Sequence, residues 1–174
     1  MPATLTILGS TGSIGESTLR VIRSFPGEFA VGGLACGSNL DLLERQIREF
    51  MPRVVAVGSP EALGSVRYGE LKKSCAGTEF LEGEEGIIEL ASRRADIVMS
   101  AIVGAAGLKP TLAAVGSSGR IALANKETLV MAGDIVMREV CKGGTELVPV
   151  DSEQSAVFSL LGGLPRGGVK RIRL

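Results

Sequence analysis

Histidine and tryptophan are both absent from this chain of 174 residues. The lack of histidine excludes Ser–His and Cys–His nucleophile pairs, an imidazole general base and any zinc site built on imidazole. Catalysis would therefore have to use carboxylates, lysine, hydroxyls or a bound cofactor.

Aromatic residues are scarce, and neither sign of charge is in excess. Only 3% of the residues are aromatic, and 19 Lys and Arg balance 19 Asp and Glu. Stacking platforms and a basic surface are the two features that usually bind nucleic acids, and the composition favours neither. We therefore expect no nucleic-acid partner.

The sequence shows no signal for export and no long apolar segment. The three cysteines, Cys36, Cys75 and Cys141, are odd in number and form no CxxC pair, so they predict neither a disulfide framework nor a thiolate metal cage. The longest apolar stretch, Ile97–Leu108, is interrupted by glycine and is too short to span a bilayer. We expect a cytoplasmic protein with no membrane partner.

What the chain does contain is a regular alternation of short β-branched runs with longer segments of helical period. This pattern predicts an α/β fold: a Rossmann-like, doubly wound, mainly parallel sheet with helices on both faces. We expect strands at Thr4–Leu8, Phe29–Ala35, Val54–Val57, Ile97–Ile102, Ile121–Ala124 and Glu146–Val150, and a further candidate at Thr78–Leu81. We expect helices at Ile14–Ser24, Leu40–Phe50, Pro60–Tyr68, Glu84–Arg93, Pro110–Val115 and Leu129–Val140.

A glycine-rich turn joins the first expected strand to the first expected helix. Gly9, Gly12 and Gly15 are spaced as GxxGxxG, and not as the GxGxxG of the usual dinucleotide fingerprint. Such a turn lets the backbone approach a pyrophosphate, which the helix N-terminus then binds through its N–H groups. The alternative is that these are ordinary turn glycines.

The second expected strand ends without the acidic residue that usually bonds the ribose of NAD. Its end is followed by Gly37, Ser38 and Asn39, with no carboxylate before Asp41. The absence of an acid leaves room for a 2′-phosphate and favours NADPH, although no arginine marks the corner. Ser38 and Asn39 can also cap the next helix, and both interpretations can hold together.

Two polar clusters follow later strands, at the edge of the sheet where such folds bind ligands. In the first, Lys126 stands between Asn125 and Glu127 and can face a substrate oxyanion; the alternative is a charged helix start. In the second, Asp151 and Glu153 can converge on one hard cation such as Mg²⁺ or Mn²⁺. The alternative there is an N-cap and an acidic first turn for a helix over 152–161.

The Tyr68–Lys72 segment matches the YxxxK pair with which short-chain dehydrogenases transfer a proton. In that family the pair comes well after the fourth strand, whereas here it precedes the fourth clearly expected strand. We interpret it as a surface pair on a helix.

Four blocks, in this order, resemble the 1-deoxy-D-xylulose 5-phosphate reductoisomerase family: Leu5–Gly15, Ala101–Leu108, Ala124–Glu127 and Pro149–Glu153. The family rearranges 1-deoxy-D-xylulose 5-phosphate and reduces the product with NADPH to 2-C-methyl-D-erythritol 4-phosphate. The step belongs to isoprene biosynthesis by the mevalonate-independent route and combines isomerase with oxidoreductase chemistry. The resemblance covers nearly the whole chain.

The resemblance implies roles for individual residues. NADPH would be contacted by Thr11, Gly12, Ser13, Ile14, Gly37, Ser38, Asn39, Asn125 and Glu127. Lys126, Asp151 and Glu153 would be catalytic, and Lys126, Ser152 and Glu153 would contact the substrate. Asp151 and Glu153 would be two of three carboxylate ligands of a magnesium or manganese ion that polarises the substrate carbonyl. Ser38 replaces a basic residue of some members, and Gln154 replaces a common histidine.

The resemblance also implies how the chain is organised. Residues 1–150 would form the NADPH-binding domain, and 151–174 would begin a truncated catalytic, metal-binding domain. The alternation over Val169–Leu174 is strand-like and lacks a closing turn. We therefore expect a fragment that has no turnover alone, taken from a protein that is a homodimer when full length. Its compartment would be the bacterial cytoplasm, or the plastid in a plant.

Two other functions would use the same turn. The first is a nucleotide-sensing NADP-binding module without catalysis, whose response would not change when alanine replaces Asp151 and Glu153. The second is a different NADP-dependent reductase, such as an amino-acid semialdehyde dehydrogenase. Enzymes of that kind pair a cysteine nucleophile with histidine, and histidine is absent.

Overall fold

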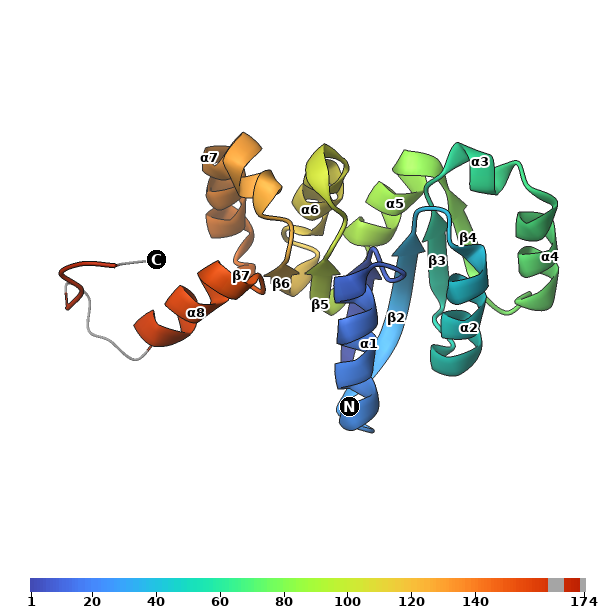
Figure 1. Ribbon diagram of the computed structural model, residues 1–174, viewed down its shortest axis with the longest axis horizontal. Helices are drawn as coiled ribbons and strands as arrows, with labels where there is room; N and C mark the ends of the chain where they lie inside the picture. Colours follow the sequence, from blue (N-terminus) through green and yellow to red (C-terminus); the bar gives the residue numbers. More distant parts are fainter. Residues whose placement is uncertain (163–167, 173–174) are drawn as a thin grey trace.

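The computed structural model describes residues 1–162 and 168–172 (Figure 1). Within this part of the chain, one sheet of seven parallel strands has the order β4-β3-β2-β1-β5-β6-β7. The strands are β1 (Ala3–Leu8), β2 (Phe29–Cys36), β3 (Val54–Val57), β4 (Glu79–Glu82), β5 (Ala95–Ser100), β6 (Ser118–Leu123) and β7 (Glu146–Pro149). The α/β prediction, with a doubly wound parallel sheet, is therefore confirmed.

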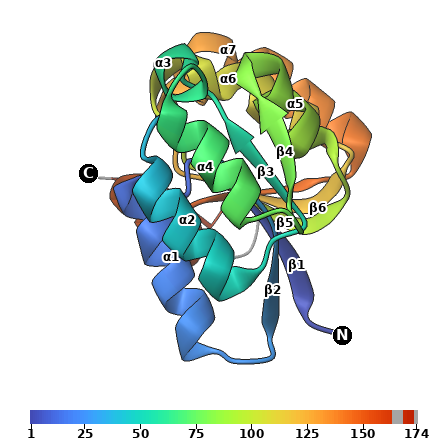
Figure 2. The same ribbon diagram turned by 90° about the vertical axis from the view of Figure 1, so that its right-hand side faces the viewer.

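Helices cover both faces of the sheet (Figure 2). They are α1 (Ser13–Ser24), α2 (Leu40–Phe50), α3 (Pro60–Leu63), α4 (Val66–Ser74), α5 (Gly83–Ser92), η1 (Gly104–Gly107), α6 (Leu108–Ala114), α7 (Lys126–Gly143) and α8 (Ser152–Leu161). Alternate strand residues point to opposite faces, so each face has its own core. On one face Ile7 and Leu34 pack with Leu19 and Leu43 of α1 and α2. On the other, Leu8 packs in a cluster with helices α5 and α6.

The strand order changes direction at β1. The chain builds β2, β3 and β4 on one side of β1, then returns to place β5, β6 and β7 on the other side. The connections leaving β1 and β5 therefore diverge, and they leave a crevice at the carboxyl ends of these two strands. Parallel sheets bind ligands at such a switch point.

The segment after β3 is two helices, so the single helix expected at Pro60–Tyr68 is wrong. Helix α3 ends at Leu63, with Gly64 as its C-cap. The Ser65 hydroxyl then accepts a hydrogen bond of 3.2 Å from the Tyr68 amide and starts α4 as its N-cap. Serine bonds to nearby amides in this way more readily than it continues a helix.

Helix α7 begins three residues earlier than the expected Leu129. The Asn125 side chain accepts from the Thr128 amide at 3.2 Å, so the helix starts at Lys126. It is kinked at Ala132, where φ is −147°, and it ends before Gly144, whose φ of +66° gives the left-handed C-cap that glycine favours.

The last described residues lie apart from the sheet. Helix α8 contacts β7 but buries none of its own side chains, and in Figure 1 it points away from the body of the fold. The strand-like alternation over Val169–Leu174 forms no strand at residues 169–172, and residues 173–174 lie outside the described part. No helix among the described residues has the length and apolar character needed to cross a bilayer.

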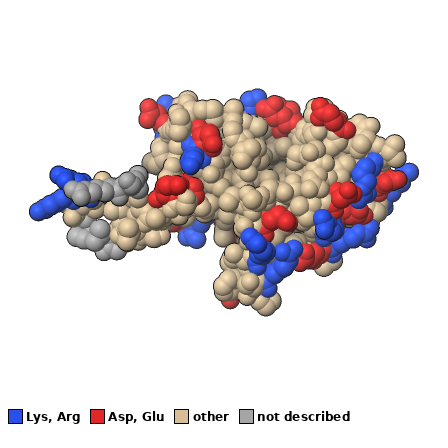
Figure 3. Space-filling model, in the orientation of Figure 1, with Lys and Arg blue, Asp and Glu red and all other residues tan. Residues whose placement is uncertain are grey.

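Charged side chains of both signs are intermixed on the face drawn in Figure 3. One network joins α2 to α4: Arg67 contacts both Asp41 and Glu44, and Glu44 also accepts from Arg48 and Ser74. These contacts, the strongest from Arg67, lower the pKa of Glu44 from 4.5 to about 2.

Replacing Glu44 with Gln should destabilise the chain by about 1 kcal/mol at pH 7. Because the folded pKa of Glu44 is depressed, its stabilisation is present above pH 4.5 and is lost as the pH falls towards 2. The difference in free energy of unfolding between wild type and E44Q should therefore shrink over that range in urea titrations. Glu70→Gln removes an exposed glutamate of α4 that has no ion pair in the described residues, and it should change stability little at any pH. A constant E44Q deficit down to pH 2 would contradict the assignment.

Candidate cofactor and metal site

The three glycines of the turn after β1 have different roles. Gly9 has a φ of +90°, and a Cβ there would lie 2.8 Å from the Ala101 carbonyl oxygen. A Cβ at Gly15 would lie 2.3 Å from the Gly9 oxygen and 2.6 Å from the Ser10 Cα. A Cβ at Gly12 would meet nothing nearer than the Gly9 oxygen at 3.4 Å. The fold therefore requires glycine at positions 9 and 15, while the space beside Gly12 is open.

The turn is fixed to its neighbours by hydrogen bonds from two sides. The amides of Gly9 and Ser10 both donate to the Ala35 oxygen of β2, at 3.0 and 2.8 Å. From α2, Gln46 Nε2 donates to the Ser10 oxygen at 3.0 Å and to Glu16 Oε1 at 3.3 Å. Gln46 is only 1% exposed. We did not predict this residue from the sequence, because its partner Ser10 lies 36 positions away.

The N-terminus of α1 is presented to solvent just after this turn. Thr11 is half-buried, and Gly12, Ser13 and Ile14 are exposed. Gly12 is the N-cap of α1 and supplies no side-chain hydrogen bond, so the first amides of the helix are open to an external acceptor. This arrangement of open amides, helix dipole and missing Cβ suits a phosphate group.

The corner after β2 carries Gly37, Ser38 and Asn39, all exposed. The Asn39 side chain accepts from the Leu42 amide at 3.1 Å, which confirms it as the N-cap of α2. A Cβ at Gly37 would meet no atom within 4 Å. The first acid after the corner, Asp41, is bonded to Arg67 at 2.7 Å. The corner is therefore open and has no free carboxylate to repel a phosphate.

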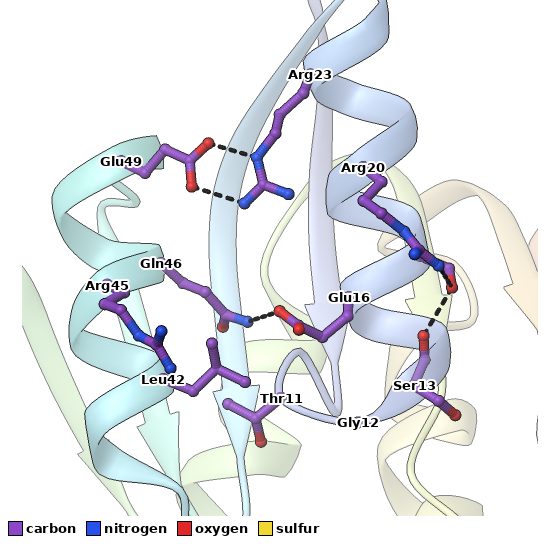
Figure 4. A pocket seen from close by; sticks show the side chains of 11 residues that line it. Thr11, Gly12, Ser13, Glu16, Arg20, Arg23, Leu42, Arg45, Gln46 and Glu49 are labelled. Atoms are coloured by element: carbon purple, nitrogen blue, oxygen red, sulfur yellow. Dashed lines mark hydrogen bonds and ion pairs between the residues drawn. The ribbon is translucent and has the colours of Figure 1, made fainter.

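Two hollows flank the glycine turn. One, of about 490 Å³, lies at the carboxyl ends of β1, β2, β3 and β5 and is mostly apolar; Gly9, Gly37, Gly58, Ile87 and Ile102 contribute to its lining. The other, of about 600 Å³, lies between α1 and α2 and includes Thr11, Gly12 and Ser13 (Figure 4). The turn and the corner after β2 together separate the apolar hollow from the second hollow, the groove between α1 and α2.

Cys36 also lines the apolar hollow, but it is 2% exposed and burial raises the pKa of its thiol to about 12. A thiol with this pKa stays protonated at neutral pH and is a poor nucleophile. The site therefore does not support the cysteine chemistry of the semialdehyde dehydrogenases.

Asn125, which follows β6, holds the loop after β5 through its side chain. It is 3% exposed, and its Nδ2 donates to the oxygens of Ile102 and Gly104 at 2.6 and 2.8 Å. Since its Oδ1 caps α7, all the polar atoms of its side chain are occupied within the protein. The adjacent Lys126 and Glu127 are exposed. In this cluster Asn125 therefore holds the protein's own backbone, and only the charges of Lys126 and Glu127 are accessible.

The Asp151–Glu153 segment forms the helix start that was the alternative interpretation, and its role as a metal ligand stays a prediction. Asp151 Oδ1 accepts from the Gln154 amide at 2.8 Å, so Asp151 is the N-cap of α8. Its other oxygen, Oδ2, is buried and has no partner within the described residues. The Ser152 hydroxyl, the amide of Glu153 itself and the charge of Lys126 lower the pKa of the exposed Glu153. No group of three metal-binding side chains forms in the described part of the chain. Within the described residues, Asp151 thus uses one carboxylate oxygen as a cap and leaves the other without a hydrogen bond.

The Tyr68–Lys72 pair lies away from this site, on α4. Its two polar ends converge on Glu82, with Tyr68 Oη donating at 2.9 Å and Lys72 Nζ at 3.1 Å. Tyr68 is buried, so the expected surface pair is wrong for the tyrosine. The pair ties α4 to β4.

Comparison with known proteins identifies the family. The sequence model of 1-deoxy-D-xylulose 5-phosphate reductoisomerase matches residues 5–133. The enzyme of that name from Shouchella clausii is 47% identical over 171 residues, which cover 98% of this chain and 44% of the relative. The Gloeobacter violaceus enzyme is 48% identical, over 98% of this chain and 43% of the relative.

Solved structures of the same enzyme have the same fold. One, in complex with NADPH, fosmidomycin and magnesium, superposes with a TM-score of 0.82 at 43% identity and covers 90% of this chain. The Zymomonas mobilis enzyme with NADPH gives 0.81 at 39% identity. This chain covers 38% and 40% of those two structures, so it spans less than half of its relatives. It belongs to the 1-deoxy-D-xylulose 5-phosphate reductoisomerase family.

Proposed function

We propose that this chain is the NADPH-binding part of an enzyme that converts 1-deoxy-D-xylulose 5-phosphate to 2-C-methyl-D-erythritol 4-phosphate. The observation that carries the proposal is the unequal roles of the glycines: the fold requires glycine at positions 9 and 15, whereas the open space beside Gly12, in front of the first amides of α1, suits an external ligand. Family membership supports the same ligand. The relatives are named 1-deoxy-D-xylulose 5-phosphate reductoisomerase, and two of the solved structures contain NADPH.

In this proposal the cofactor lies across the glycine turn. The open amides of Ser13 and Ile14 hold the pyrophosphate, and Thr11 and Ser13 add hydroxyls. The corner Gly37–Asn39 holds the ribose phosphate, and the apolar hollow at the sheet edge excludes water from the rest. NADPH supplies the hydride, and a divalent cation supplies Lewis acidity at the oxygens of the substrate.

The metal and substrate functions belong to the second polar cluster. Asp151 supplies its unpartnered Oδ2, and Glu153 supplies an exposed carboxylate whose lowered pKa keeps it ionised. Lys126 acts on Glu153 through its charge and is accessible to an anionic substrate; Ser152 lies between the two carboxylates in the chain. Residues 1–150 would thus be the cofactor domain, and 151–174 the start of the metal-binding part. In the whole protein we propose a homodimer in the bacterial cytoplasm, with Mg²⁺ or Mn²⁺.

Titration with reduced nicotinamide cofactors tests the cofactor assignment directly. The fluorescence of NADPH should change on binding to this chain, and its Kd should be at least about tenfold lower than that of NADH. The reason is that the corner after β2 has no acid for the NADH ribose and has open amides for a phosphate. Equal affinity for the two cofactors, or binding of neither, would contradict the proposal.

A further inference from the structure

The corner after β2 offers no cation to balance the negative charge of a bound 2′-phosphate. A 2′-phosphate bound at Gly37–Asn39 needs a cation, and sites of this kind usually supply an arginine. Ser38 provides only a hydroxyl, and no basic residue lies between Gly37 and Leu40. The cation must therefore come from another part of the fold.

Arg45 of α2 faces the glycine turn. It lines the groove between α1 and α2 together with Thr11, Gly12 and Leu42. In Figure 4 its side chain extends towards Leu42, which lies between it and Thr11, and so in the direction of the N-terminus of α2. Helical side chains lean this way because each Cα–Cβ bond tilts towards the N-terminus. Asn39 lies six residues earlier, about 9 Å along the helix axis and about a third of a turn around it, so an extended arginine approaches the corner from the side of Thr11.

Each of the other charged groups of the groove has at least one hydrogen-bond partner within the protein. Arg23 makes a double hydrogen bond to Glu49, at 2.5 and 2.7 Å, and Glu16 accepts from Gln46. Arg20 donates to the Ser17 hydroxyl at 2.8 Å. Within the described part of the chain, Arg45 makes no ion pair and no side-chain hydrogen bond. Its guanidinium is therefore available to an anion from outside.

We propose that Arg45 is the specificity-determining residue that binds the 2′-phosphate of NADPH, in place of the basic residue that Ser38 does not supply. This inference rests on the proposed function and deepens it. The planar guanidinium can donate two parallel hydrogen bonds to phosphate oxygens. The backbone amides and hydroxyl of the Gly37–Asn39 corner bind the same group from the other side. NADH lacks this phosphate and gains nothing from Arg45.

The test compares Arg45→Gln with the wild type in fluorescence titrations of NADPH and NADH. The Kd for NADPH should rise about tenfold or more, while the Kd for NADH should change less than about twofold. Arg45→Lys should give an intermediate loss, since it keeps the charge and loses the paired donors. Arg48→Gln is the matched control: it removes the same charge from the same helix, but Arg48 bonds Glu44 and does not line the groove.

The outcomes separate the inference from the proposed function. If wild type prefers NADPH and Arg45→Gln keeps that preference, the Arg45 assignment is wrong and the cofactor assignment stands. An equal NADPH loss in Arg45→Gln and Arg48→Gln would also overturn it, because a long-range charge effect would then suffice. Failure of the wild type to bind NADPH would overturn the proposed function and the inference with it. Circular dichroism should show that each variant is folded; Arg45→Gln should melt with the wild type, and Arg48→Gln should lose only the small contribution of its exposed bond to Glu44.

Discussion

Gly15→Ala should destabilise the chain by about 3 kcal/mol or more, enough to unfold a marginally stable domain. The added Cβ would lie 2.3 Å from the Gly9 oxygen and 2.6 Å from both the Cα and the oxygen of Ser10. These are backbone atoms, and the turn cannot retreat because the amides of Gly9 and Ser10 are both bonded to Ala35. Helix α1 would have to separate from the turn. Urea denaturation followed by circular dichroism measures the loss.

The matched control for this substitution is Gly69→Ala in helix α4. A Cβ at Gly69 meets no atom within 4 Å, and alanine is the better helix former, so this variant should gain up to about 1 kcal/mol. The pair isolates the steric term, since each variant adds the same methyl group to a helix. If Gly15→Ala kept the stability of the wild type, the close approach of helix and turn would be disproved.

The order of strands and helices could be predicted because the spacing of hydrophobic residues shows which side chains are buried. The predicted ends of several elements were wrong. Strands β5 and β6 begin at Ala95 and Ser118, before the apolar residues Ile97 and Ile121 where we expected them. Their first residues pair with neighbouring strands through the backbone, and Asp96 accepts from the Thr4 amide and hydroxyl at 2.7 Å. Backbone pairing at the rim of a sheet needs no apolar side chain, so the pattern gives no sign of it.

The candidate site could be predicted where the signal is local and not where it is tertiary. The glycine turn and the corner after β2 follow strands directly, so sequence order alone places them at one edge. Gln46 and Arg45 carry no local signal; they face the turn only because α2 packs beside α1. Asn125 shows the reverse case: its position at the sheet edge is as expected, but the structure uses its side chain to hold the loop after β5.

Gly12→Val should abolish tight NADPH binding, raising the Kd about 100-fold or more, while the folded state persists. Gly12 has extended dihedrals, φ −83° and ψ 170°, which valine adopts readily, and its Cβ would find only the Gly9 oxygen at 3.4 Å. The cost to folding should stay within about 1 kcal/mol, the difference between glycine and valine as an N-cap. The clash would instead be with the pyrophosphate, because the valine methyls would occupy the space in front of the first amides of α1. Calorimetric titration with NADPH measures the affinity, and urea denaturation measures the stability of the same sample.

Gly12→Ala provides the graded control, with a smaller side chain in the same place. If the lost space in front of α1 is the cause, the Kd should increase from glycine to alanine to valine while the free energy of unfolding stays nearly level. Gly15→Ala shows the opposite combination, a loss of stability from a methyl group that meets the turn itself. The two positions lie three residues apart in the sequence. At Gly15 the neighbouring backbone atoms exclude a side chain, whereas at Gly12 they do not. A Gly12→Val chain that folds and still binds NADPH normally would mean that the cofactor does not lie over this turn, and the proposed function would lose its main support.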